Sequence, residues 1–140
     1  MDEKVKQAIY TAVANEPFAR VLNMKLKALD DGYALVEMPY DPSVNDNIYE
    51  RAHGGAVYGL IDEAFEASCQ ADGTIAVAMD VNVTYVSSPL AGAILQAESK
   101  QVSQTKKTTG FYIQVTDQDN RLIATCQALA YRTGKPIPFL

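Results

Sequence analysis

Two adjacent glycines, Gly54 and Gly55, stand where a polar loop gives way to a segment rich in Ala, Leu, Glu and Phe. That segment predicts a helix, whose first N–H groups have no helical partner and lie at the positive end of the helix dipole. Without side chains to shield them, these donors could polarise a carbonyl oxygen and stabilise an oxyanion formed from it. A tight turn that requires a left-handed residue is the alternative explanation for a Gly-Gly pair.

Asp62 lies in the middle of the same predicted helix, although aspartate is a mediocre helix former. At about 100° per residue, Asp62 shares a stripe with Gly55, Tyr58, Gly59 and Phe65 and projects toward the side of the free N–H donors. A carboxylate beside a polarised carbonyl can act as general base for water or attack the carbonyl directly. The pattern alone leaves open an Asp62 that faces solvent. Glu63 points to a different face, which also carries Ala56, Leu60 and Ala67.

Asn47 and His53 lie on the approach to this helix. Either side chain could orient water or substrate. The alternatives are structural, because Asn in a loop commonly sets the turn conformation and a lone His before a helix commonly serves as a hydrogen-bonding residue. No Ser/His/Asp triad is apparent, since the single histidine has no partner and no hydroxyl lies in a nucleophile elbow.

The two cysteines, Cys69 and Cys126, each sit in an apolar stretch and are far apart in the sequence. This placement predicts small buried side chains and argues against a disulfide, redox or nucleophilic role. One histidine and two scattered cysteines do not make a zinc site, so we expect no metal and no cofactor.

The net charge of −5 and the pI near 4.7 argue against a protein that binds nucleic acid through its phosphate backbone. No apolar run approaches the roughly 18 to 20 residues needed to span a bilayer, and the charged N-terminus lacks the apolar core of a signal peptide. We therefore expect a cytoplasmic protein without membrane contact.

The 140 residues predict a single domain, spanning 1–140, with one hydrophobic core. Apolar spacing predicts a short helix over 5–14, and the segment 54–70 is long enough for four to five helical turns. Alternation and β-branched content predict strands over 24–30, 33–38, 74–86, 93–102, 108–116 and 122–132, and polar residues predict a loop over 39–51. This order indicates an α+β fold, in which a largely antiparallel sheet wraps a long central helix.

His53-Gly54-Gly55, with Asn47 six positions before the histidine and Asp62 nine positions after it, resembles the hotdog-fold acyl-CoA thioesterases, most closely the phenylacetate-type (PaaI-like) branch. The resemblance continues through the strand at 76–85, the turn at 88–92 and the closing strand at 131–133, and covers roughly residues 18 to 133. It implies a hotdog fold with a long central helix, a mostly antiparallel sheet of about five to six strands and a short N-terminal helix.

The resemblance also implies roles for individual residues in the hydrolysis of acyl-CoA thioesters. Asp62 would be the general base or nucleophile, and the N–H of Gly54 or Gly55 would hold the thioester carbonyl. Asn47 would position the attacking water, and His53 would support the carbonyl-binding loop. The family pairs its long strands across a two-fold axis, so the resemblance implies a site assembled from two subunits in a homodimer or homotetramer. A long apolar strand at 74–86 whose edge needs covering agrees with this.

Ala78 is one departure, because some relatives carry a Ser or Thr at this place on the central strand that helps to position water. We expect the loss of this hydroxyl to weaken or retune activity, not to abolish it. Tyr58 and Phe65 could line an acyl pocket, although core packing is the alternative for either. Lys106 and Lys107 could meet the CoA phosphates, with solubilising charge at a strand end as the alternative.

Two other functions use the same fold. A non-catalytic module that binds or senses acyl-CoA would be favoured by loss of the carboxylate, but Asp62 and Asn47 are both present. A hotdog dehydratase or hydratase uses a His and a carboxylate at a different spacing from that of His53 and Asp62. Thioester hydrolysis is therefore the predicted activity.

Overall fold

A computed structural model describes all residues 1–140 and contains four helices and six strands. The helices are α1 (Glu3–Asn15), α2 (Pro17–Val21), α3 (Pro42–Asn45) and α4 (Gly54–Cys69). The strands are β1 (Lys25–Asp30), β2 (Tyr33–Pro39), β3 (Thr74–Tyr85), β4 (Ile94–Gln104), β5 (Thr108–Thr116) and β6 (Leu122–Pro136). None of the helices is long and apolar enough to cross a membrane.

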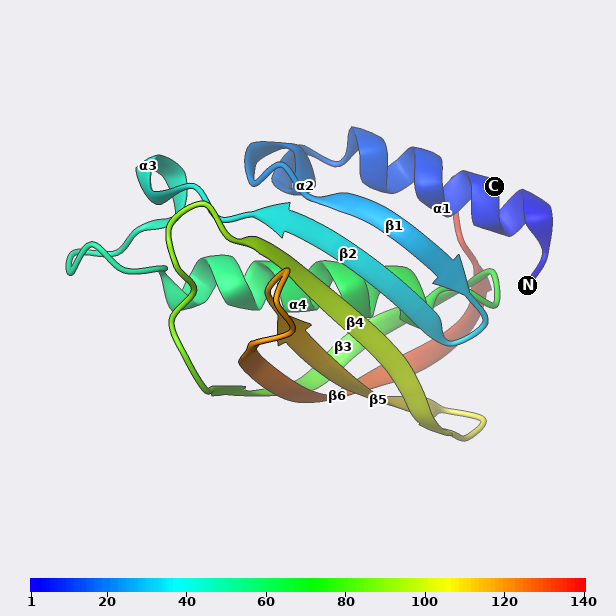
Figure 1. Cartoon of the computed structure of the whole chain (residues 1–140). Coiled ribbons are helices and arrows are strands. Elements are labelled where there is room, and N and C mark those ends of the chain that lie inside the picture. Colours follow the sequence, from blue (N-terminus) through cyan, green and yellow to red (C-terminus); the bar gives the residue numbers. More distant parts are fainter.

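The six strands form one sheet in the order β1-β2-β4-β5-β6-β3, and every neighbouring pair is antiparallel. The sheet curves around α4, while α1 lies beside β1 at one edge (Figure 1). The predicted α+β arrangement, with a long central helix and a short N-terminal helix, is confirmed. The sequence did not predict α2, or α3 within the segment 39–51, because each is a helix of only four or five residues that begins at a proline, too short to show helical periodicity.

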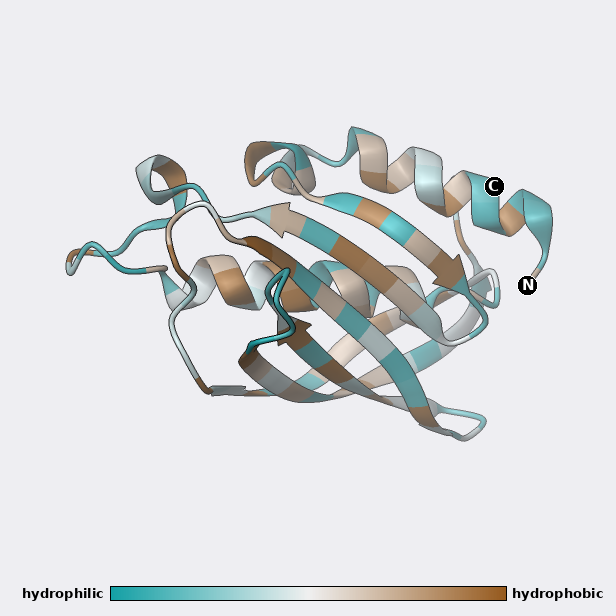
Figure 2. Cartoon of the chain, viewed as in Figure 1, coloured by the Kyte–Doolittle hydropathy of each residue, from teal (hydrophilic) through white to brown (hydrophobic).

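The hydrophobic core lies between α4 and the concave face of the sheet. Its largest fully buried side chains include Phe65, Leu60 and Ile61 from α4, which meet apolar residues of β2, β4, β5 and β6. Figure 2 shows the apolar bands along these elements. Cys69 and Cys126 are free thiols buried in this core, as predicted. Eleven of the sixteen residues of α4 are buried, as expected for a helix that a sheet encloses.

Strand β3 forms one edge of the sheet and pairs only with β6. Its pairing register shifts between Ala78 and Asp80, so a bulge interrupts the regular alternation of faces. Val81 and Val83 pack against the core, whereas Val77 and Met79 are 53% and 58% exposed. The alternating sequence predicted the strand but not this change of face, because one inserted residue moves later side chains to the other side.

Candidate functional site

The N-terminus of α4 leaves one backbone donor free. His53 is the N-cap, and its Nδ1 accepts a 2.9 Å hydrogen bond from the N–H of Gly55. The Gly54 N–H has no acceptor in the chain. The Gly54 carbonyl accepts a 2.9 Å bond from the hydroxyl of Tyr85 on β3, which fixes this peptide. Of the two glycines that the sequence singled out, Gly54 therefore offers the available N–H.

A cavity of about 540 Å³ opens beside this donor. Its lining includes Arg51, Gly54 and Tyr85, together with the segment 86–89 that follows β3. A Cβ added to Gly54 would lie 3.2 Å from the Tyr85 ring, so a side chain here would press on the residue that anchors the peptide. Tyr85 was not predicted to belong to the site, because its partner Gly54 lies 31 residues earlier and no local sequence pattern indicates a contact over that separation.

Asp62 is half-buried, and its carboxylate has no hydrogen bond or ion pair within the chain. Burial raises the pKa of this carboxyl above its ordinary value, which makes it a stronger base than an exposed aspartate. Asp62 lies eight residues after Gly54, which at 1.5 Å per residue is about 12 Å along the helix axis. One protomer therefore does not bring this carboxylate to an atom bound at Gly54.

Asn47 shapes the loop that leads to α4. Its Oδ1 accepts bonds from the backbone N–H groups of Tyr49 at 2.9 Å and Arg51 at 3.3 Å. The Asn47 N–H also bonds the Arg51 carbonyl at 2.7 Å. Asn47 therefore sets the conformation of this loop, which was the structural alternative for it. Its side-chain NH₂ has no partner in the chain and is free to donate a hydrogen bond.

The two aromatic residues proposed from the sequence for the acyl pocket differ in burial. Phe65 is 1% exposed and packs edge-on against Phe111, with ring centroids 5.5 Å apart. Tyr58 is 37% exposed, and burial of its ring followed by the charge of Asp62 raises the pKa of its hydroxyl. Phe65 thus fills the core, whereas Tyr58 lies at the surface near Asp62.

The remaining candidates lie on β3 and in the β4–β5 turn. Ala78 is exposed beside the bulge of β3. Lys106 and Lys107 are exposed in the turn, where the Lys107 ammonium lies 5.6 Å from the centre of the Tyr131 ring. This turn adjoins the beginning of β3, since Tyr131 pairs with both Thr108 and Val77. Within one protomer it is at the opposite end of β3 from Tyr85 and Gly54.

The buried thiols are poor candidates for a nucleophile. Burial raises the pKa of Cys69 to about 12 and that of Cys126 to about 11. Both therefore remain protonated at neutral pH, and the reactive form of a cysteine is the thiolate.

The family model of the thioesterase superfamily matches residues 49–124, which is more than half of the 140 residues. The chain belongs to the thioesterase superfamily. A putative esterase of Archaeoglobus fulgidus is 31% identical over 138 residues, which cover 99% of this chain and 87% of the esterase. The acyl-coenzyme A thioesterase PaaI of Escherichia coli is 27% identical over 137 residues, or 98% of this chain and 97% of PaaI.

The solved structure of E. coli PaaI superposes on this thioesterase with a TM-score of 0.90 and covers 96% of this chain and 97% of that chain. The predicted hotdog fold, the likeness to the PaaI branch and the assignment as a thioesterase-type enzyme are confirmed by these relatives. The roles of individual residues stay predictions.

Proposed function

We propose that this thioesterase hydrolyses acyl-CoA thioesters to free CoA and a carboxylic acid. The observation that carries the proposal is the unpaired Gly54 N–H at the start of a long helix, beside a cavity of about 540 Å³. A thioester carbonyl bound there meets a fixed donor and the positive end of the helix dipole. The activity named for its relative PaaI supports a CoA ester as the substrate.

The working site in this proposal is assembled from two copies of the chain. A general base must approach within about 3 Å of the proton that it removes, directly or through one water. The 12 Å axial separation of Gly54 and Asp62, estimated at about 1.5 Å per residue, is too large for one protomer. Two β3 edges that pair antiparallel across a two-fold axis place their α4 helices side by side in opposite directions, so that Gly54 faces Asp62 of the partner subunit.

The exposed edge of β3 supports this pairing. Its backbone is bonded to β6 on one side alone, and Val77, Met79 and Tyr85 are each more than half exposed. An apolar, unprotected edge of twelve residues is a surface that folded proteins normally cover. A homodimer covers it, and two such dimers give the homotetramer.

Asp62 acts on the bound thioester as general base or as nucleophile. As a base, it takes a proton from water while the water oxygen bonds to the carbonyl carbon, and the resulting oxyanion is stabilised by the Gly54 N–H. The oxyanion then collapses, the carbon–sulfur bond breaks, and the CoA thiolate takes up the proton. Asn47 positions the water through its free NH₂, and His53 holds the loop by capping α4.

The same pairing supplies cations for the CoA phosphates. Lys106 and Lys107 lie near the beginning of β3, and an antiparallel partner brings the beginning of one β3 next to the end of the other. The partner subunit's Lys106 and the partner subunit's Lys107 would then approach the cavity at Gly54, where they could meet phosphate oxygens. Tyr58 and Ala78 line the acyl side of this site.

The test is release of CoA thiol from a panel of aromatic, short-chain and medium-chain acyl-CoAs. We expect turnover of at least one acyl-CoA, with the preferred acyl group defining the pocket around Tyr58. The binding of the same panel is measured by calorimetry on the same preparation. Tight binding without turnover of any acyl-CoA would contradict hydrolysis and favour an acyl-CoA sensing module.

A further inference from the structure

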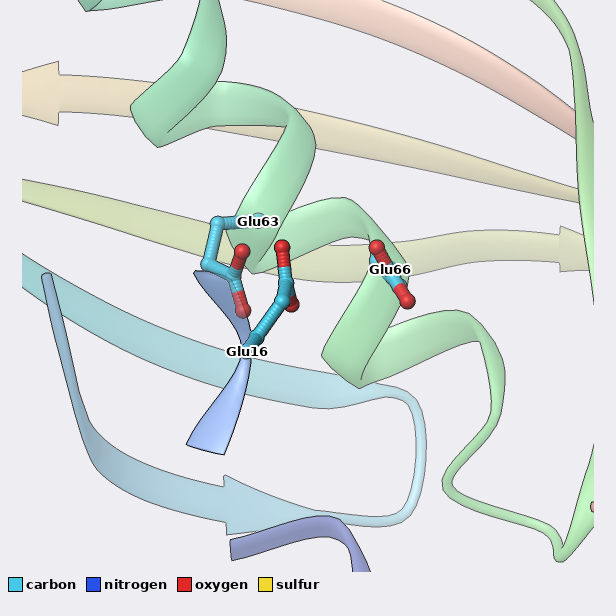
Figure 3. A group of neighbouring side chains, drawn as sticks. All are labelled: Glu16, Glu63 and Glu66. Carbon is cyan, nitrogen blue, oxygen red and sulfur yellow. The ribbon is translucent and has the colours of Figure 1, made fainter. Parts of the chain in front are cut away.

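Three carboxylates from different parts of the chain converge away from the Gly54 cavity. Glu63 and Glu66 project from α4, and Glu16 comes from the junction of α1 and α2 (Figure 3). Ligand oxygens of the three residues all lie within 4.8 Å of one another. Glu63 is 3% exposed, on the helix face that carries Leu60 and meets the core.

No group in the chain compensates these three charges. None of the carboxylates forms an ion pair, and the buried Oε1 of Glu63 has no hydrogen-bond partner. Glu63 and Glu16 are close enough to share a hydrogen bond when one of them is protonated. Burial, followed by the charges of Glu16 and Glu66, raises the pKa of Glu63 well above its ordinary value. A buried carboxylate is normally paired or bound to a metal, so Glu63, the buried member of the three, lacks a partner.

A cavity of about 290 Å³ adjoins the cluster, and its polar lining consists of Glu16, Glu66, Asn15 and Gln70. No lysine or arginine lines it. The amide NH₂ groups of Asn15 and Gln70 bond to helix carbonyls at 2.8 and 3.4 Å, which leaves both amide oxygens free as acceptors. The free polar groups of the lining are therefore oxygen acceptors with a net negative charge, and the other five lining residues are apolar.

We propose that Glu16, Glu63 and Glu66 bind a hard divalent cation, for which Ca²⁺ is the best match. Hard cations take carboxylate and amide oxygens, whereas zinc and softer metals prefer the nitrogen and sulfur ligands that are absent here. Ca²⁺ accepts six to eight oxygen ligands in flexible geometry, and three carboxylates with neighbouring amide oxygens and waters meet that requirement. Mg²⁺ demands a near-ideal octahedron and gives up its waters reluctantly, so it binds more weakly here.

The bound cation would join the α1–α2 junction to α4. Glu16 ends α1 and precedes α2, while Glu63 and Glu66 lie on the central helix. The sequence suggested no metal, because the three glutamates are separated by up to 50 residues and match no ligand motif. Glu63 points about 100° away from Asp62 around α4, whereas Glu66 lies one turn after Asp62, close enough for the charge of Asp62 to raise the pKa of Glu66. Occupancy of the cation site is measured without reference to thioester hydrolysis.

The experiment titrates the chelator-treated full-length protein with Ca²⁺, Mg²⁺ and Mn²⁺ at pH 8 by calorimetry, and follows the melting temperature at saturation. We expect one Ca²⁺ per chain with a Kd of about 10⁻⁶ to 10⁻⁴ M. Binding to the folded state alone should raise Tm by about 3 °C or more. The substitutions Glu63→Gln and Glu66→Gln should each weaken binding at least tenfold, which corresponds to about 1.4 kcal/mol.

Glu3→Gln is the matched control, since it removes the same charge from an exposed position at the far end of α1. This variant should bind Ca²⁺ like the wild type. The proposal is overturned if none of the three cations binds, or if binding is unchanged in both Glu63→Gln and Glu66→Gln. A Glu63→Gln protein that is simply more stable, with a wild type indifferent to cations, would mean that the glutamates share protons instead.

Discussion

Replacement of Asp62 by asparagine is expected to lower kcat for CoA release by about 10²- to 10⁴-fold, the usual contribution of a general base. The substitution keeps the shape of the side chain and removes the proton acceptor. Because the wild-type carboxylate makes no hydrogen bond or ion pair within the chain, no structural contact is lost with its charge. The change should therefore appear in kcat, with little effect on KM.

The melting temperature of the same variant is the control for folding. Burial raises the pKa of Asp62, so the folded state disfavours the ionised form at neutral pH, and removal of the charge should leave Tm unchanged or higher. Loss of activity together with retained or increased stability is the signature of a residue kept for function. An Asp62→Asn enzyme within a few-fold of the wild-type kcat would exclude the proposed role.

The substitution Gly54→Pro is expected to lower kcat by about 10²- to 10³-fold, because it removes the one free N–H that would stabilise the oxyanion. The helix should tolerate this change. Proline is favoured at the first position of a helix, where its missing N–H has no helical acceptor. The preceding residue, His53, has φ −63° and ψ 130°, which is the extended conformation required before proline.

Gly54→Ala separates the loss of the donor from the added bulk. Alanine places the same Cβ near the Tyr85 ring, at 3.2 Å, but retains the N–H. We expect the alanine enzyme to lose far less activity than the proline enzyme when both are assayed at saturating acyl-CoA. Equal losses in the two variants would show that crowding of Tyr85, and not the N–H, determines the effect.

The elements that hold the core were predictable from local pattern. Alternation and β-branched residues identified all six strands, and the observed bounds differ from the predicted ones by a few residues. The exception is the end of β6, which continues to Pro136 because Thr74 of β3 pairs with that residue. The bulge of β3 likewise depends on its register against β6. Pairing between strands that are distant in the sequence cannot be predicted from the residues of one strand alone.

The chemistry of the site was predictable in type but not in geometry. The sequence singled out Gly54, Gly55 and Asp62, yet the choice between the glycines depends on the cap that His53 makes to Gly55. The shared helix stripe suggested that Asp62 and the free donors act together. Residues on one stripe of a helix point in the same direction, but each residue between them adds about 1.5 Å along the axis. The separation of Gly54 and Asp62 along α4 therefore supports a site that uses a second subunit.

The measurement that tests the two-subunit site most directly is subunit complementation between Asp62→Asn and Gly54→Pro. In a mixed dimer, one site retains both Gly54 and the partner subunit's Asp62, while the other site lacks both. Refolding equal amounts of the two inactive proteins together should restore about a quarter of the wild-type CoA release, since half of the dimers are mixed and each carries one intact site. A mixture that contains mixed dimers but remains as inactive as its parents would place the catalytic groups within one protomer and contradict the proposed site.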